Sequence, residues 1–328
     1  MTVAPIPAEW SPHRAMWVGW PSHADLWEDN LEPAQAEVEA LVRALAGPGR
    51  ETVKLLVGHE DALAGAQARF DGVAGVTVVD GRFGDIWLRD TGPIFGAGSA
   101  TARSFRFNGW GGKYNLPFDD TVADQIATAA GVLLSRTDAV MEGGALDHDG
   151  AGTILTTRQC LLNPNRNEGW TEAVAEDVLG QALGATRVVW LGDGLMNDHT
   201  DGHVDNLARF VGPGVVACPV AFGVDDPNAE VYDACARDLA AAGFEVVRIP
   251  SPGLIADEDG EAVPASHMNF LIANGAVVVP TYGNDTAARL AGEALAGVFP
   301  GREVVLLPSI AILSGGGSFH CISQQEPG

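Results

Sequence analysis

The sequence has few basic residues and no long hydrophobic run. It contains 19 Lys and Arg against 43 Asp and Glu, which gives a formal net charge of −24 over 328 residues. Nucleic acids and anionic membrane surfaces are bound through basic faces, so this charge disfavours both as partners and is permissive toward small cations. No stretch approaches the roughly 20 apolar residues that a bilayer crossing needs, and residues 1–10 carry no basic segment followed by an apolar run. We therefore expect a soluble, cytoplasmic protein with no membrane or nucleic-acid partner.

Cysteine is also scarce. Cys160, Cys218, Cys235 and Cys321 are widely spaced and include no C-x-x-C pair, so neither a disulfide framework nor a zinc ribbon is indicated. Cys160, Cys218 and Cys235 stand in apolar or helical surroundings and are interpreted as small buried hydrophobes. Cys321 differs, because the glycine run 315–317 precedes it and would keep side chains away from a nucleophilic thiolate.

The motifs of the common nucleotide-binding folds are missing as well. There is no G-x-G-x-x-G after the first predicted strand and no G-x-x-x-x-G-K-[ST], which removes the usual reasons for a doubly wound parallel sheet. What recurs instead is a strand, a helix, a second strand and then a polar segment. The last four such units begin near residues 103, 152, 214 and 275, and the first has an added helix and strand within residues 60–80. Five units arranged radially explain this pattern best, so we expect a single domain, residues 1–328, folded as a five-bladed α/β propeller with pseudo-fivefold symmetry and a central site.

Each polar segment combines glycine with ionisable or polar residues. The segments are residues 84–95, 141–150, 199–211, 266–275 and 315–323. The first contains Trp87, Arg89 and Asp90, where an Arg-Asp ion pair is the plain alternative, and the second contains Glu142 before two glycines. These side chains would meet at the centre of the propeller.

The segment 197–206 admits two interpretations. His199 and His203 are four residues apart and would share a helical face as metal ligands. Gly202 and the following β-like residues argue against a helix, and H-E-x-x-H is absent. On a strand, His203 and Asp205 would project to one face as a base beside a carboxylate, which requires no metal. By the same strand geometry His320 would point away from Cys321 and be structural.

One Cys, one His, two Asp and one Glu on equivalent segments would form a strongly anionic centre. Such a centre serves a developing oxyanion poorly, because oxyanions need hydrogen-bond donors. A planar cation fits better, since guanidinium can pair with two carboxylates. The carboxylates should also raise the pKa of the Cys321 thiol in the empty site, so that the thiolate forms mainly when the cation binds.

The sequence combines the motifs W-x-R-D-T-G-P from Trp87, E-G-G from Glu142, G-H-V-D-N from Gly202 and G-G-G-x-x-H-C ending at Cys321. By this combination, and nearly end to end, it resembles the agmatine deiminases, within the guanidino-group-modifying (pentein) superfamily of five-bladed α/β propellers. The resemblance implies hydrolysis of agmatine to N-carbamoylputrescine and ammonia without metal or organic cofactor, and it allows a homo-oligomer.

The resemblance also implies the roles of individual residues. Cys321 would be the nucleophile, His203 the general acid and base, Asp90 and Asp205 the guanidinium ligands, and Glu142 the carboxylate that holds the histidine and the substrate. Trp87, Gly316 and Gly317 are expected to line the substrate site.

Several alternatives stay open from sequence. His267 stands where the family pattern has a tyrosine, and the nearby residues 258–270 lack the family's arginine, so arginine, a peptidyl-arginine or another guanidino amine could be the substrate. An amidinotransferase with the same nucleophile, a metallohydrolase built on His199 and His203, and a non-catalytic polyamine-binding protein are the other candidates.

Overall fold

The strands pair into five separate sheets within residues 3–328, the part of the chain that the computed structural model describes. The first sheet has the strand order β16-β1-β2-β3. Its elements are β1 (His13–Trp20), α1 (Ala24–Trp27), α2 (Leu31–Ala46), β2 (Val53–Val57), α3 (Glu60–Phe70), β3 (Val76–Asp80) and β16 (Ser323–Pro327). The added helix and strand predicted for the first unit are thus confirmed as α3 and β3.

The other sheets have three strands each, in chain order. The second has α4 (Leu88–Thr91), β4 (Ile94–Phe95), β5 (Thr101–Arg106), α5 (Gly109–Gly112), α6 (Val122–Ala130) and β6 (Leu133–Val140). The third has β7 (Asp147–His148), β8 (Thr153–Thr157), α7 (Arg158–Leu161), α8 (Glu172–Leu183) and β9 (Arg187–Leu191). The fourth has β10 (Arg209–Gly212), β11 (Val215–Val220), α9 (Ala229–Ala241) and β12 (Glu245–Pro250). The fifth has β13 (Leu271–Ile272), β14 (Ala276–Thr281), α10 (Asp285–Val298), β15 (Glu303–Pro308) and α11 (Ile310–Leu313).

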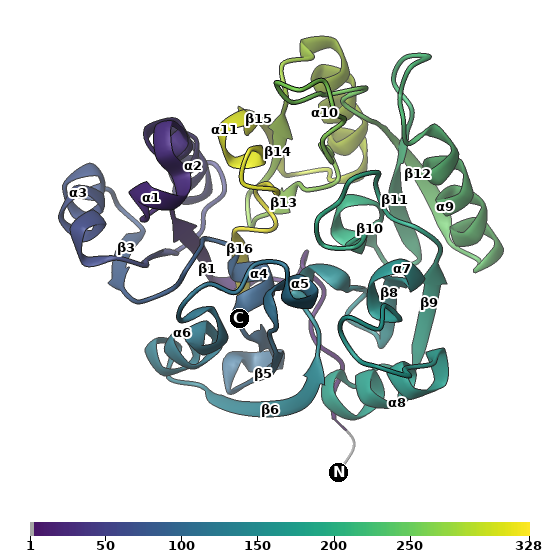
Figure 1. Ribbon diagram of the computed structural model, residues 1–328, viewed down its shortest axis with the longest axis horizontal. Helices are drawn as coiled ribbons and strands as arrows, with labels where there is room; N and C mark the ends of the chain where they lie inside the picture. Colours follow the sequence, from purple (N-terminus) through teal and green to yellow (C-terminus); the bar gives the residue numbers. More distant parts are fainter. Residues whose placement is uncertain (1–2) are drawn as a thin grey trace.

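Every sheet repeats one pairing pattern. A strand that follows a polar segment runs antiparallel to its neighbour, and that neighbour runs parallel to the next strand through a helical crossover. Figure 1 shows the sheets disposed around the centre of the molecule, with α3, α6, α8, α9 and α10 toward its outer edge and α4, α5 and β16 near its centre. The mixed α/β class that the sequence predicts is confirmed.

The repeated pattern determines where the polar segments lie, because each segment leads directly into the antiparallel strand of its sheet. The central strands are buried on both sides, as in β1, β8, β11 and β14, and each packs against the apolar face of a crossover helix. Residues just before β4, β7, β10, β13 and β16 therefore emerge between these packed units, toward the middle.

Two local predictions were wrong. Residues 203–208 do not form a strand, because Gly202 has a φ of +86° and Val204–Asn206 form a 3₁₀ turn before β10 begins at Arg209. His320 and Cys321 also lie in a turn, ahead of β16. The strand-face arguments made for these residues therefore do not apply, although their side chains still meet other predicted residues.

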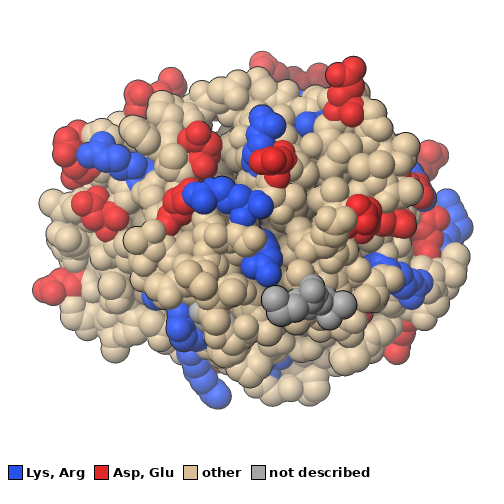
Figure 2. Space-filling view, turned by 90° about the horizontal axis from the view of Figure 1, so that it is seen from below, with Lys and Arg blue, Asp and Glu red and all other residues tan. Residues whose placement is uncertain are grey.

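The surface carries both signs of charge. On the face drawn in Figure 2, Asp and Glu side chains are interspersed with Lys and Arg rather than separated from them. Among residues 3–328, no helix combines the length and the hydrophobicity that a membrane-spanning segment needs.

Candidate active site

Three of the predicted residues surround Gly144, which lies in the 3₁₀ turn Gly143–Ala145. A Cβ atom at Gly144 would lie 2.6 Å from His203 Nδ1, 2.8 Å from Asp90 Oδ1 and 3.1 Å from Asp205 Oδ2. A side chain at this position would therefore collide with all three, which explains a glycine here. Polar segments that are far apart in the sequence thus converge, as the repeat predicts.

Cys321 adjoins this group through Asp205. Its Sγ lies 3.7 Å from Asp205 Oδ2, and Asn269 Nδ2 donates a hydrogen bond to Sγ at 3.1 Å. Burial, and then the carboxylates of Asp205 and Asp90, raise the pKa of the Cys321 thiol well above its usual range. The structure thus agrees with the expectation that the resting site holds a thiol rather than a thiolate.

Asn269 fixes the turn that holds the nucleophile, although no role was predicted for it from the sequence. Its Oδ1 accepts hydrogen bonds from the backbone N–H groups of His320 at 2.8 Å and of Cys321 at 3.3 Å. Its Nδ2 also donates to Asn206 Oδ1 at 2.8 Å. The sequence offers one indication of this role: Asn269 lies in the fourth polar segment, residues 266–275, to which no other functional residue was assigned.

The glycine run is explained by two tryptophans. A Cβ at Gly315 would lie 2.8 Å from the Trp27 ring, and one at Gly317 would lie 2.6 Å from the Trp87 ring and 3.1 Å from Cys321 Cβ. Both indoles donate to Asp85, Trp27 at 3.0 Å and Trp87 at 2.6 Å, so the rings are held in place. The methyl group of an alanine at Gly317 would collide with both Trp87 and Cys321, so these two residues line the same wall of the site.

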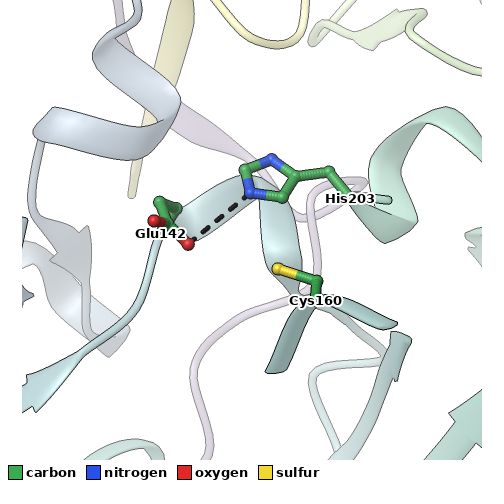
Figure 3. Close-up of side chains that lie close together, drawn as sticks. All are labelled: Glu142, Cys160 and His203. Atoms are coloured by element: carbon green, nitrogen blue, oxygen red, sulfur yellow. Dashed lines mark ion pairs between the residues drawn. The ribbon is translucent and has the colours of Figure 1, made fainter. Parts of the chain in front are cut away.

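His203 is fully buried between two carboxylates. Its Nδ1 lies 3.8 Å from Asp90 Oδ1, and its Nε2 lies 3.6 Å from Glu142 Oε2 (Figure 3). Burial opposes a charge on the ring, but Asp90, followed by Cys160 and Glu142, raises the pKa of His203 well above its usual range. The ring is therefore an imidazolium at neutral pH, which suits a proton donor.

Each carboxylate is oriented by its own partners. Asp90 accepts from Trp110 Nε1 and from the backbone N–H of Gly144, both at 2.9 Å. Burial first, and then Asp205 and Glu142 against the opposing effect of His203, raise the pKa of Asp90. Glu142 accepts from Arg166 Nε at 2.9 Å; burial opposes its charge, but His203 and Arg166 lower its pKa below the usual range.

Asp205 is connected to a buried network of charges behind the site. Its Oδ2 lies 2.8 Å from His320 Nδ1, whose Nε2 lies 3.2 Å from Glu9 Oε2. Glu9 in turn pairs with Arg209, whose Nε donates to Asp147 Oδ2 at 2.6 Å. His320 therefore holds Asp205 in place and is not free to act as the base for Cys321. Glu9 and Arg209 received no role from sequence, since only the fold brings them to His320.

Unpaired acceptors remain in this otherwise tightly bonded cluster. Asp205 Oδ1 and Glu142 Oε2 are buried and find no hydrogen-bond donor among the described residues. Buried oxygens of this kind normally have a partner. Both are suited to the N–H groups of a cationic guest.

Two other predicted residues have different contacts. His199 is exposed, stacks on Tyr114 and lies 3.0 Å from its hydroxyl, whereas His203 is fully buried, so the two do not form a pair of metal ligands. Gly316 has a φ of +107°, and a Cβ there would lie 3.7 Å from His199 Nδ1 rather than against Cys321.

His267, the departure from the family pattern, is buried. Its Nδ1 lies 2.7 Å from the backbone oxygen of Pro250, and its ring stacks on Tyr282. Burial lowers the pKa of His267 to about 4, so it is neutral at pH 7 and adds no charge beside the site.

Comparison with known proteins gives relatives over nearly the whole chain. The family model described as Porphyromonas-type peptidyl-arginine deiminase matches residues 5–327. An agmatine deiminase of Stutzerimonas stutzeri is 38% identical, covering 98% of this chain and 95% of the relative. The solved structure of an Enterococcus faecalis agmatine deiminase superposes with a TM-score of 0.90 at 30% identity, covering 98% of this chain and 95% of that one. A C. jejuni agmatine deiminase with substrate bound gives a TM-score of 0.88 at 26% identity, covering 98% and 96%.

Proposed function

Because the chain belongs to the Porphyromonas-type peptidyl-arginine deiminase family, we propose that it hydrolyses agmatine to N-carbamoylputrescine and ammonia. Relatives that match it over nearly the full length of both chains are agmatine deiminases. The observation that carries the proposal is the convergence of His203, Asp90 and Asp205 around Gly144, with the Cys321 thiol beside Asp205. This proposal includes the finer architecture, a single five-bladed propeller with pseudo-fivefold symmetry, which the ring of sheets in Figure 1 supports.

Substrate binding uses the carboxylates. Asp90 and Asp205 accept hydrogen bonds from the guanidinium nitrogens, and Asp205 Oδ1 has no competing partner among residues 3–328. The bound cation offsets the negative charge that disfavours the thiolate, so Cys321 loses its proton on binding. Trp87 and Gly317 form the flat wall against which the planar group lies.

The chemistry then runs in two halves. The Cys321 thiolate attacks the guanidinium carbon, and the His203 imidazolium gives a proton to the departing nitrogen, which leaves as ammonia. An S-alkylthiouronium remains on Cys321. His203, now neutral, removes a proton from a water molecule that attacks the same carbon. Taking this proton restores the His203 imidazolium. Collapse of the tetrahedral adduct then expels the Cys321 sulfur, and the proton of the new hydroxyl group returns to that sulfur as the carbonyl of the urea product forms.

Ammonia release by the purified protein tests this proposal. We expect release from agmatine to exceed release from arginine, a peptidyl-arginine and a simple amide. Cys321→Ala should abolish it, whereas Cys218→Ala, which removes a buried thiol from a separate core cluster, should retain it. No release from any guanidino compound would refute the proposed function, and preference for arginine or a peptide would refute the assigned substrate.

A further inference from the structure

Cys160 lies beside two residues of the site, a placement that its interpretation as a plain hydrophobe does not explain. Its thiol, a Glu142 oxygen and a His203 ring nitrogen lie within 4.8 Å of one another, and all three residues are buried. Figure 3 shows the three side chains directed toward a common point from three separate segments. Within residues 3–328, Cys160 belongs to none of the hydrophobic clusters that form the core.

Two of the three ligand atoms at this point face each other as an ion pair but make no hydrogen bond to any described residue. Glu142 Oε2 and His203 Nε2 are fully buried and have no hydrogen-bond partner in the described part of the chain. Arg166 holds the other Glu142 oxygen at 2.9 Å and so directs Oε2 toward the histidine. Cys160 is fixed by the short helix α7, where its backbone N–H donates to Thr157 Oγ1 at 3.3 Å.

The spacing between Glu142 and His203 suits a metal ion better than a hydrogen bond. Glu142 Oε2 and His203 Nε2 are 3.6 Å apart, too far for a good hydrogen bond. Two oxygen or nitrogen ligands of a tetrahedral Zn²⁺, each at about 2.0 Å, are separated by roughly 3.3 Å. Thiolate, imidazole and carboxylate together form a donor set that favours Zn²⁺ over Mg²⁺ or Ca²⁺.

From this geometry we propose that Glu142, Cys160 and His203 form a binding site for a thiophilic divalent cation, Zn²⁺ in particular, and that its occupation inhibits the enzyme. Coordination would release one proton from the Cys160 thiol and one from the His203 imidazolium, so two protons leave as one divalent cation enters. The total charge of the buried cluster is then unchanged. His203 is thereby held on the metal and can neither donate nor accept a proton. The inhibition rests on the proposed deiminase function, whereas the binding does not.

Metal binding is tested without activity by cobalt titration of the metal-free Cys321→Ala protein. Co²⁺ bound to a thiolate gives a charge-transfer absorption in the near ultraviolet, and Zn²⁺ added afterwards should abolish it. We expect the band in Cys321→Ala and in Cys321→Ala combined with Cys218→Ala, the matched control. It should disappear when Cys160→Ser is combined with Cys321→Ala. Absence of the band from Cys321→Ala, or its survival in the Cys160→Ser protein, would overturn the site.

Cys160→Ser keeps the size of the side chain, and thermal unfolding of each variant shows whether it is folded. If Cys160→Ser does not fold, Glu142→Gln replaces it in the same titration. The amide oxygen is a weaker ligand, so the midpoint of the cobalt titration should rise at least tenfold. An unchanged midpoint would exclude Glu142 as a ligand.

Inhibition is measured separately on the catalytically competent protein. Zn²⁺ should suppress ammonia release and a chelator should restore it, and the half-inhibiting concentration should rise at least tenfold in Cys160→Ser, with each protein compared with its own uninhibited rate. Equal sensitivity would place the inhibitory metal elsewhere, for example on Cys321. Loss of activity on chelation would contradict inhibition. If neither protein turns over any guanidino compound, the proposed function fails while the cobalt titration still decides the site.

Discussion

The protonation of Cys321 can be controlled by a single neighbouring carboxylate. Asp205 Oδ2 lies 3.7 Å from the sulfur. At an effective dielectric constant of about 20, two negative charges at this separation repel each other by about 4 kcal/mol. Removing this charge by Asp205→Asn therefore favours the thiolate by as much as about a thousandfold. Reorientation of His320, which loses a carboxylate partner, reduces this gain, so we expect an increase between about tenfold and about a thousandfold.

The assay is the pH dependence of thiolate absorbance, with the spectrum of Cys321→Ala subtracted to remove the other cysteines. Because the pKa of the Cys321 thiol is raised in the folded protein, wild type should show little thiolate near pH 7 and more only in alkaline solution. The Asp205→Asn curve should lie at lower pH. Guanidinium ion added to wild type should move its curve in the same direction, since a cation then offsets the carboxylates.

Iodoacetamide gives a second readout, because alkylation follows the thiolate. Asp205→Asn should be alkylated faster than wild type at pH 7, although its deimination activity falls through loss of the guanidinium ligand. A wild-type thiolate already formed at pH 7 without ligand, or an Asp205→Asn profile that coincides with the wild-type profile, would refute this reasoning.

Other substitutions have defined expectations. Gly317→Ala places a methyl group 2.6 Å from the Trp87 ring and should lower kcat on the order of a hundredfold, whereas Gly297→Ala, with nothing within 4 Å, should leave kcat unchanged. Arg209→Met removes the guanidinium partner of two buried carboxylates, Glu9 and Asp147, and should lower the free energy of unfolding by about 3–5 kcal/mol, measured by denaturant titration. Burial raises the pKa of Asp119 to about 7, so the folded state binds its proton more tightly and stability falls as pH rises from about 4 to about 7. Asp119→Asn should therefore raise the free energy of unfolding at pH 8, by no more than about 4 kcal/mol, but not at pH 4, and equal increases at both pH values would contradict the assignment.

The elements of the fold were largely predictable because they follow local patterns. The alternation of β-branched strands with alanine-rich helices indicated the repeated unit, and the helix and strand predicted within residues 60–80 are α3, Glu60–Phe70, and β3, Val76–Asp80. The polar segments after the strands pointed to Cys321, His203 and Asp90 because a repeat places equivalent segments in equivalent positions. Individual roles came from the family resemblance and not from spacing.

What sequence could not supply were contacts between distant segments. Asn269 meets the nucleophile from 52 positions away, and Cys160, which lies in the short helix α7, reaches His203 across the intervening α8 and β9 of the chain. Nothing local distinguishes either residue from an ordinary asparagine or a buried thiol. The strand predicted at His203 failed for a different reason, because the positive φ at Gly202 and the 3₁₀ turn after it depend on surrounding contacts rather than on residue preference.

The pairing of β16 with β1 has a consequence for the order in which the site is assembled. Residues 13 and 327 are register partners, and the buried Glu326 is bonded by Trp17 Nε1 at 3.1 Å and Lys54 Nζ at 2.9 Å. Cys321 lies just before β16, so its turn is fixed only when strands from opposite ends of the chain meet. During synthesis on the ribosome, the sheets from β4 to β15 can form while the first sheet still lacks its edge strand and the nucleophile has not been made. A nascent chain can thus bury most of its core before it can carry out any chemistry.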